Sequence, residues 1–269
     1  MTHRIASTYE KYAGDPGENY ERYFVPSIGV PSARPVIEAA GVKEGDRVLD
    51  VACGTGVAAR LAAQRVGPTG AVAGVDPTPP MLEVARRTSS AIDWLEGSAE
   101  MLPVPDDSFD VVLCSLGFQF FTDKIKSLQE MHRVLRAGGR AALGTPGPTP
   151  PLFEAIEEAL TDHVGPAASA FVDAVFSVHD PDQVRELAAN AGFSDVEIDT
   201  GPLPLRLPPP AEFFWQYVHS TPLAGPAAQL DEAARAALER DVVVRCQPFV
   251  DDDALVMAPS LLVATAQRN

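Results

Sequence analysis

Two aspartates bracket a glycine-rich turn early in the chain. Asp50 lies in the apolar run Val48–Ala52, the turn Cys53–Gly56 follows directly, and Asp76 ends the next apolar run. A glycine turn between a strand and a helix directs backbone N–H groups at a ligand and lets it approach closely. A carboxylate just before the turn attracts an ammonium, and one at the next strand end can accept hydrogen bonds from two ribose hydroxyls. The pair therefore predicts a site for a nucleoside joined to an amino acid.

The glycine turn alone is also compatible with a second cofactor class. The spacing Gly54-x-Gly56-x-x-Ala59 fits a dinucleotide fingerprint, which would make the protein a nicotinamide-dependent oxidoreductase. Asp50 argues against this alternative because its charge would repel a pyrophosphate. Cys53 lies in the turn, but the chain has only three cysteines and no CxxC pair, so we expect buried thiols and no metal site.

Apolar runs alternate with amphipathic segments around the turn. The expected strands are 48–52, 71–76, 92–95, 109–115 and 140–145, and the expected helices are 57–66, 80–88 and 122–136. This alternation predicts an α/β fold, a doubly wound and mostly parallel sheet of seven strands with helices on both faces. The carboxyl ends of parallel strands meet at one edge, where such sheets bind ligands.

The second half of the chain is less regular. The expected elements are helices over 152–164, 181–192 and 231–240 and strands over 196–207 and 255–264. Between these two strands lies a helical insert, 208–250. Its segment 213–217 is too aromatic for a solvated loop, so we expect it to bury against other residues and to cover an apolar pocket.

Length and composition fit one globular protein. The chain has 269 residues, of which 46% are hydrophobic and 22% charged, so a packed core is feasible. We expect a single domain over 1–269. It would consist of a helical lead-in (1–45), a cofactor-binding half (46–147) and a substrate-side half (148–269).

Charge and hydropathy restrict the partners. A formal net charge of −16 argues against nucleic acid, whose backbone requires a basic surface. No apolar run approaches the roughly 18 residues of a membrane span, and the start lacks the apolar stretch of a signal peptide. We expect a cytoplasmic protein with a small-molecule acceptor and no membrane partner. A homodimer stays open.

Four ordered motifs between about Gly45 and Gly147 resemble one enzyme family. They are Val-Leu-Asp-Val-Ala-Cys-Gly-Thr-Gly (48–56), Gly-Val-Asp with Met-Leu five residues on (74–82), Gly-Ser-Ala-Glu-x-Leu-Pro with Ser-Phe-Asp-Val-Val (97–112), and Glu-Met-His-Arg-Val-Leu-Arg-x-Gly-Gly (130–139). Together they resemble the class I S-adenosylmethionine-dependent methyltransferases, especially the small-molecule type of ubiquinone and menaquinone biosynthesis.

The resemblance implies a cofactor, S-adenosyl-L-methionine, with S-adenosyl-L-homocysteine as product, and a set of contacts. Asp50, Ala52, Gly54 and Gly56 would hold the methionine end, Asp76 the ribose, Met81 the adenine face, Ser98 and Ala99 the adenine edge, and Ser115 the methionine side. Cys53, Pro77 and Glu100 complete the expected cofactor-binding set. The family usually has Asp at the position of Ser98, which puts the contact with the adenine amino group in doubt.

The expected reaction is methyl transfer to the O, C or N atom of a small apolar or aromatic acceptor. Placement of the acceptor in line with the methyl group supplies much of the rate acceleration. A base is needed only if the acceptor must lose a proton. Weak candidates for that base are His163, His179 and His219, and the candidate walls of the acceptor pocket are Tyr9, Tyr20, Phe24, Phe118, Gln119 and Trp215. An alternative is an enzyme that binds the same cofactor but catalyses a reaction without methyl transfer, such as a cyclisation.

Overall fold

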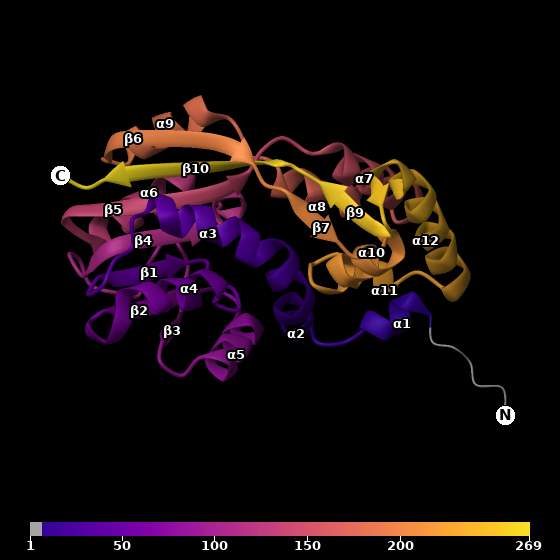
Figure 1. Ribbon diagram of the computed structural model, residues 1–269, viewed down its shortest axis with the longest axis horizontal. Helices are drawn as coiled ribbons and strands as arrows, with labels where there is room; N and C mark the ends of the chain where they lie inside the picture. Colours follow the sequence, from indigo (N-terminus) through magenta and orange to yellow (C-terminus); the bar gives the residue numbers. More distant parts are fainter. Residues whose placement is uncertain (1–6) are drawn as a thin grey trace. The chain divides into compact units, whose positions relative to one another are not determined.

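The computed structural model describes residues 7–269, and its contacts divide the chain into two compact units. The sheet unit comprises Gly29–Pro148, Val175–Leu203 and Ser260–Asn269. The helical unit comprises Met1–Ile28, Thr149–Ala174 and Pro204–Pro259. Each unit is therefore assembled from segments that are far apart in the sequence, as the colours of Figure 1 show.

The sheet unit is built on one seven-stranded sheet. Its strands are β1 (Arg47–Val51), β2 (Ala71–Asp76), β3 (Asp93–Glu96), β4 (Phe109–Ser115), β5 (Leu135–Pro146), β6 (Ser194–Pro202) and β10 (Ser260–Gln267). The strand order is β3-β2-β1-β4-β5-β10-β6. The first five strands in this order run parallel, and β10 runs antiparallel to both of its neighbours. This is the expected mostly parallel, doubly wound sheet.

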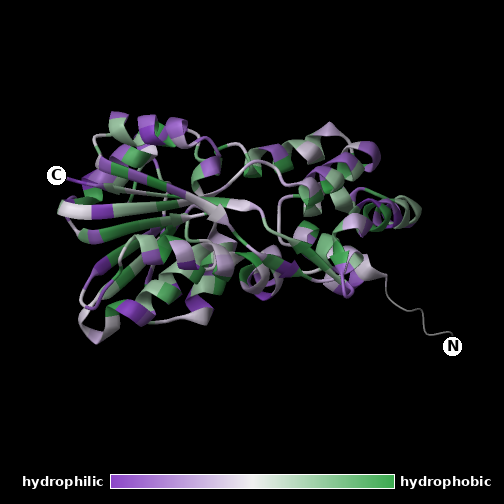
Figure 2. Ribbon diagram, turned by 45° about the horizontal axis from the view of Figure 1, so that its top comes forward, coloured by the Kyte–Doolittle hydropathy of each residue, from purple (hydrophilic) through white to green (hydrophobic). Residues whose placement is uncertain are grey.

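Helices cover both faces of this sheet because successive strand residues point to opposite sides. The helical elements of this unit are α3 (Val30–Ala39), α4 (Val57–Val66), η2 (Gly67–Thr69), α5 (Pro79–Thr88), η3 (Phe118–Phe120), α6 (Lys124–Val134) and α9 (Pro181–Asn190). On β1, Val48 packs into the core beneath α3, α4 and α5. Its neighbour Leu49 packs into the core beneath α6 and α9. The helices of this unit show polar and apolar sides in Figure 2.

The helical unit has a small sheet of its own. Its elements are α1 (Thr8–Tyr12), α2 (Pro16–Asn19), the π-helical stretch η1 (Tyr20–Gly29), α7 (Pro151–His163), α8 (Pro166–Val175), β7 (Leu205–Leu207), α10 (Pro210–His219), α11 (Ala224–Ala228), α12 (Glu232–Cys246), η4 (Gln247–Phe249), β8 (Val250–Asp251) and β9 (Ala254–Met257). The order of the antiparallel sheet is β7-β9-β8. Asp252 and Asp253 form the exposed turn between β8 and β9.

The aromatic segment of the insert is buried, as expected. It lies in α10, where Phe213, Phe214, Trp215 and Tyr217 are each at most 4% exposed. The rings of Phe213 and Tyr217 pack edge-on against Phe153 of α7. Packing of α10 on α7 and α12 therefore accounts for its composition.

Two expected strands are each divided in two. The segment 196–207 forms β6 in the large sheet and β7 in the small one, and 255–264 forms β9 and β10 in the same two sheets. Prolines lie at both breaks, Pro202 and Pro204 in the first and Pro259 in the second. Proline lacks the N–H that a central ladder requires, so pairing stops there.

The helix expected over 122–136 is shorter, because α6 ends at Val134 and β5 begins at Leu135. Arg268 near the end of the chain donates to the carbonyls of His132, Arg133 and Leu135. Carbonyls at a helix end lack N–H partners from the helix itself, and the Arg268 guanidinium replaces those partners. Helix α8 and strand β8 were not expected from the sequence.

Candidate functional site

The carboxyl ends of neighbouring parallel strands bring the expected cofactor-binding residues to one edge of the sheet unit. Asp50 pairs with Gly74 in the register of β1 and β2, and Asp76 is the last residue of β2. Ser98 follows β3 by two residues, and Ser115 ends β4. These residues come from four sequence segments, and the parallel register alone places them at the same edge.

The turn after β1 alternates between left-handed and other backbone conformations. Ala52, Gly54 and Gly56 have φ angles of 57°, 55° and 89°. A Cβ on Gly56 would lie 2.1 Å from the ring of Trp94, so no side chain fits there. Gly56 is therefore required both by its φ and by the ring of Trp94, which supports the turn from β3. A non-glycine residue such as Ala52 in this region is costly, and such strain gathers at functional sites.

Asp76 holds the same turn from the end of β2. Its two carboxylate oxygens accept hydrogen bonds from the N–H of Gly54 at 2.8 Å and of Thr78 at 2.9 Å. The residue is 6% exposed. Each carboxylate oxygen can accept more than one hydrogen bond, so capacity remains for the two hydroxyls of a ribose. Asp76 thus links the glycine turn to the start of α5.

Asp50 supports the first turn of α4. It is 1% exposed, and its Oδ2 accepts the N–H of Ala59 at 2.9 Å. The N-cap of α4 is Gly56, which has no capping side chain, so Asp50 satisfies one of the N–H groups that a helix start leaves free. The pKa of Asp50 is raised to about 7, mainly by burial; the Ala59 hydrogen bond opposes this shift, and the charge of Asp76 contributes to it. A cation bound beside Asp50 would favour its charged form.

The polar groups around the turn fit the expected cofactor. Thr55 is fully buried in it, and its Oγ1 has no hydrogen-bond partner among the described residues. Two carboxylates and the positive end of the α4 dipole lie beside the left-handed turn. This donor and acceptor set matches a zwitterionic amino-acid group and a ribose.

The segment after β3 carries the residues expected at the adenine edge. Ala99 is buried, and Ser98 and Glu100 are half-buried. The Ser98 hydroxyl donates to the Glu100 carboxylate, which also accepts the N–H of Thr122 at 3.1 Å. Burial opposes the charge of Glu100, but these hydrogen bonds keep its pKa below its usual value. Further along the edge, Pro77 is exposed and Met81 is half-buried in α5.

A second left-handed residue follows β4. Leu116 has a φ of 58°, and a Cβ on the next residue, Gly117, would lie 2.6 Å from the Cβ of Ala52. Gln119 donates to the carbonyl of Leu116 at 2.9 Å, and its Oε1 has no partner among residues 7–269. Phe118 is fully buried in the core of the sheet. Leu116 was not among the expected site residues, because only its backbone angle singles it out.

The remaining residues expected at the acceptor lie in the helical unit. Tyr9 packs edge-on against Trp215 at 5.0 Å between ring centroids and against the ring of His219 at 4.6 Å. The guanidinium of Arg235 lies 4.2 Å from the centre of the Tyr9 ring. Trp215 is fully buried and donates to Glu239. We call Tyr9, Trp215, His219 and Arg235 the aromatic cluster.

Another aromatic pair lies in η1. The rings of Tyr20 and Phe24 stack at 4.6 Å between centroids, and both residues are half-buried. This pair belongs to the helical unit, as the aromatic cluster does. Contact of either group with an acceptor stays a prediction.

The three candidate bases have different surroundings. His219 is 5% exposed, and its Nε2 has no partner in the described part of the chain. The pKa of His219 is lowered mainly by burial and also by the charge of Arg235. A hydrogen bond with the Tyr9 backbone acts in the opposite direction and raises the pKa. His163 Nε2 lies 3.0 Å from Asp241, and His179 is exposed, with its Nδ1 2.7 Å from the carbonyl of Phe176. Only His219 combines burial with an unpaired ring nitrogen.

Residues 7–269 contain neither a cluster of metal-binding side chains nor a membrane-spanning helix. No group of three or more His, Cys, Asp or Glu side chains there could hold a metal ion. No helix in this part of the chain has the length and hydropathy required to span a bilayer. All three cysteines are buried and free, in agreement with the expectation from their spacing.

Residues 49–143 match the sequence model of a family described as methyltransferase domain. Among curated relatives, the ubiquinone/menaquinone biosynthesis C-methyltransferase UbiE of Xanthomonas oryzae pv. oryzae is 46% identical over 123 residues, which are 43% of this chain and 49% of that protein. The demethylmenaquinone methyltransferase of Staphylococcus aureus is 39% identical over 123 residues, 44% of this chain and 51% of that protein. The chain thus spans about half the length of the curated relatives it matches.

Solved structures share the fold. The YcgJ protein of Bacillus subtilis aligns with a TM-score of 0.57 at 22% identity, over 88% of this chain and 98% of that one. The Haemonchus contortus phosphoethanolamine N-methyltransferase 2, solved in complex with S-adenosyl-L-methionine, aligns with a TM-score of 0.61 at 20% identity, over 98% of this chain and 60% of that one. At these identities the alignments show the Rossmann-like fold. Over residues 49–143, this chain is therefore similar in sequence to the family of methyltransferase domains.

Proposed function

We propose that this protein transfers the methyl group of S-adenosyl-L-methionine to a small apolar or aromatic acceptor. The observation that carries the proposal is the pair of buried carboxylates on adjacent strands: Asp76 holds the left-handed glycine turn, and Asp50 holds the start of α4 that follows it. The methyltransferase domain match covers both carboxylates. The names of the curated relatives support a quinone-like acceptor as the first to test.

The chain's own residues would bind and orient rather than react. Asp76 would accept hydrogen bonds from the ribose hydroxyls, Asp50 would stabilise the ammonium, and Met81 would lie against the adenine. Ser98 and Ala99 would contact the adenine edge, and Ser115 would line the methionine side. When bound, the cofactor supplies a methyl group on a good leaving group, so placement of the acceptor in line supplies much of the acceleration.

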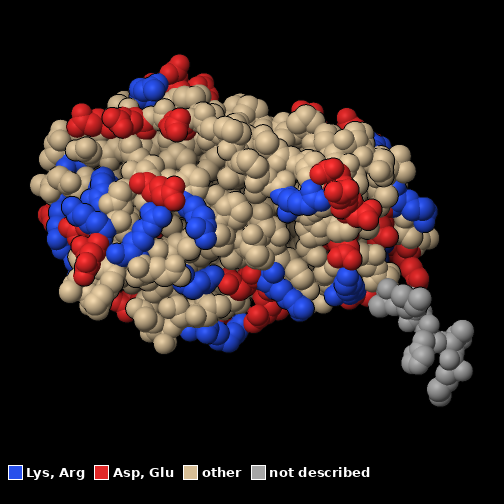
Figure 3. All heavy atoms as spheres, viewed as in Figure 1, with Lys and Arg blue, Asp and Glu red and all other residues tan. Residues whose placement is uncertain are grey.

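A small acceptor agrees better with the charge distribution than nucleic acid does. The formal net charge is −16. In Figure 3 basic side chains are interspersed with acidic ones on the face shown, without a broad basic area. Binding a phosphate backbone depends on clustered basic residues that displace counterions. We therefore propose a small-molecule acceptor, with the aromatic cluster and the pair Tyr20 and Phe24 as contacts.

The test is calorimetric titration with S-adenosyl-L-homocysteine, followed by mass spectrometry of acceptors. We expect micromolar binding, equivalent to about 8 kcal/mol. Asp76→Ala should weaken it by about 1.5–3 kcal/mol, because a charge-assisted bidentate contact is lost. Glu197→Ala, at an exposed carboxylate of the edge strand β6, is the control and should bind as the wild type does.

The outcomes separate the alternatives. An acceptor that gains the mass of one methyl supports the proposal. Tight binding of S-adenosyl-L-methionine with a changed acceptor that lacks the methyl would favour a reaction such as cyclisation. Binding of NADH without binding of either S-adenosyl ligand would make the protein an oxidoreductase and overturn the proposal. If Asp76→Ala binds within about twofold of the wild type, Asp76 is not the ribose ligand.

A further inference from the structure

The segment between β3 and β4 lacks regular secondary structure, although it carries the residues expected at the adenine edge. Its only backbone pairing among the described strands and bridges joins Ser98 to Met101. Loops of this kind are mobile unless other groups hold their backbone. In this protein the carbonyl of Asp76 holds Gly97 at the start of the segment, and groups of α6 hold its middle.

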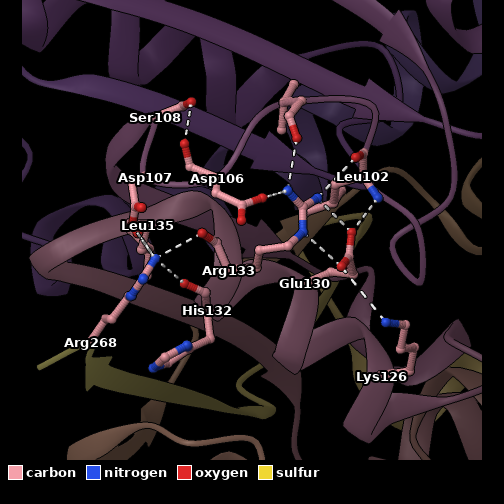
Figure 4. Close-up of polar contacts among 11 residues, drawn as sticks. Leu102, Asp106, Asp107, Ser108, Lys126, Glu130, His132, Arg133, Leu135 and Arg268 are labelled. Atoms are coloured by element: carbon pink, nitrogen blue, oxygen red, sulfur yellow. Dashed lines mark hydrogen bonds and ion pairs between the residues drawn. The ribbon is translucent and has the colours of Figure 1, made fainter.

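Arg133 of α6 makes a planar set of contacts with this segment. Its Nη1 donates to the carbonyl of Val104 at 3.0 Å and to Asp106 Oδ1 at 2.6 Å. Its Nη2 donates to the carbonyl of Leu102 at 3.1 Å. Figure 4 shows the guanidinium lying among these acceptors. Only the fixed fork of an arginine presents its donors in this arrangement.

Glu130, one turn earlier on α6, orients the guanidinium and binds the same segment. Its two oxygens accept from Arg133 Nε at 2.9 Å and Nη2 at 2.7 Å. Its Oε2 also accepts the N–H of Leu102 at 2.9 Å (Figure 4). The Arg133 hydrogen bond is the main reason why the pKa of Glu130 lies below its usual value, against the effect of burial. The N–H and C=O of Leu102 are thus both held by this ion pair.

The other end of the segment is tied to the start of α6. The Oε1 of Glu100 accepts the N–H of Thr122 at 3.1 Å and of Asp123 at 3.4 Å. Asp123 is itself the N-cap of α6. Residues 100–104 therefore span α6 from its first residue to its last turn and are fixed at both ends.

We propose that Arg133 and Glu130 are positioning residues for the adenine side of the cofactor site. They act through the backbone of Leu102 and Val104, which sets where Ser98 and Ala99 lie. This inference rests on the proposed function, because it assigns the segment after β3 to the adenine of S-adenosyl-L-methionine.

The experiment measures discrimination as well as affinity. Wild type and Arg133→Lys are titrated with S-adenosyl-L-homocysteine and with S-inosylhomocysteine, its analogue without the adenine amino group. Lysine keeps the charge but cannot bind Leu102, Val104 and Asp106 together. We expect the affinity for S-adenosyl-L-homocysteine to fall about tenfold, as for a misplaced contact, and the ratio of the two affinities to move toward one.

The matched control is Arg136→Lys. Arg136 makes an ion pair with Asp110 at 2.8 Å and does not contact the segment, so this variant should keep the wild-type ratio. A second variant, Glu130→Gln, keeps an oxygen for Leu102 but weakens the hold on Arg133. It should shift the ratio in the same direction, by about threefold, and serves if Arg133→Lys does not fold.

The two proposals fail in different ways. A folded Arg133→Lys that discriminates as well as the wild type, measured where urea curves show both to be native, would overturn the positioning role and leave the proposed function intact. The same applies to a folded Glu130→Gln with the wild-type ratio. If the wild type binds neither ligand, the proposed function fails, and the positioning role fails with it.

Discussion

Different interactions hold the glycine turn of the sheet unit and the aromatic cluster of the helical unit. In the turn, backbone angles and hydrogen bonds dictate the residue types: Gly56 leaves no room for a Cβ, and Asp76 accepts two backbone N–H groups. In the aromatic cluster, side-chain packing dominates, as the ring contacts of Tyr9 with Trp215 show.

The difference explains which region reveals its ligand. Requirements set by the backbone restrict a position to one or two residue types, so the sequence of the turn resembles that of other proteins with the same site. Packing can be satisfied by many combinations of apolar residues of similar volume. The aromatic cluster therefore specifies burial without specifying an acceptor.

The largest expected effect is that of Trp215→Ala. The side chain is fully buried, and its Nε1 donates to Glu239. Removing it leaves a cavity and an unpaired carboxylate, so we expect the free energy of unfolding of the helical unit to fall by about 3–5 kcal/mol. Urea denaturation followed by tyrosine and tryptophan fluorescence measures this loss.

The same variant tests whether the two regions are independent. Titration with S-adenosyl-L-homocysteine, where the variant is folded, should give the wild-type affinity, while the KM for the acceptor rises or kcat falls. Trp215→Phe, which keeps most of the apolar volume, is the milder control. A parallel loss of cofactor affinity would show that the two regions are not independent.

The next effect concerns the pH dependence of the turn. Burial raises the pKa of Asp50 to about 7. Between the ordinary value near 3.8 and pH 7, the folded protein keeps a proton that the unfolded chain releases, so stability falls as pH rises. Asp50→Asn removes this effect and keeps an oxygen for Ala59. The variant should gain stability relative to the wild type from pH 4 to 7, reaching about 2–4 kcal/mol.

Binding should change in the opposite direction. If Asp50 stabilises the cofactor's ammonium, Asp50→Asn is more stable than the wild type above pH 7 yet binds S-adenosyl-L-homocysteine more weakly. Asp46→Asn is a matched control, because Asp46 is also buried but pairs with Arg140 at 2.7 Å. Its loss should destabilise the protein. Equal affinity in Asp50→Asn and the wild type would confine Asp50 to supporting α4.

The sequence predicted the sheet unit well because its elements obey local rules. Helix α4 runs over Val57–Val66 and β4 over Phe109–Ser115, as expected from the apolar runs and their stops. Strands β9 and β10 were predicted as one, because an apolar run around Pro259 does not reveal that its halves pair in different sheets. Pairing between distant segments, such as β10 with β5, is set by tertiary packing.

The candidate site shows the same limit. The types and order of Asp50, Gly56 and Asp76 predicted a glycine turn flanked by two acids, and the structure places them together. The left-handed backbone of Leu116 and the ion pair of Arg133 with Glu130 depend on three-dimensional geometry that no spacing expresses. The motif containing Glu130 and Arg133 was visible in the sequence, but its contact with Leu102 was not.

The smallest effect on stability is expected for His219→Gln, which therefore isolates chemistry from folding. Glutamine keeps a polar group of similar length, so the loss should be about 1 kcal/mol or less. The pKa of His219 lies below its usual value, mainly because of burial, so the ring is neutral at pH 7 and its Nε2 can accept a proton. Below about pH 6.5 the unfolded wild type binds a proton on His219 more readily than the folded protein does, so acidification lowers the stability of the wild type. The His219→Gln variant lacks this part of the pH dependence of stability.

Activity then decides what the unpaired nitrogen of His219 does. If Nε2 takes a proton from the acceptor, His219→Gln lowers kcat by about 100-fold or more with an acceptor whose hydroxyl must ionise. Raising the pH should restore part of that rate, because the acceptor then ionises without a base. His163→Gln is the control, since its ring already pairs with Asp241. Unchanged kinetics in both variants would assign His219 to the packing of Tyr9 and Trp215 and leave methyl transfer without a base from these two histidines.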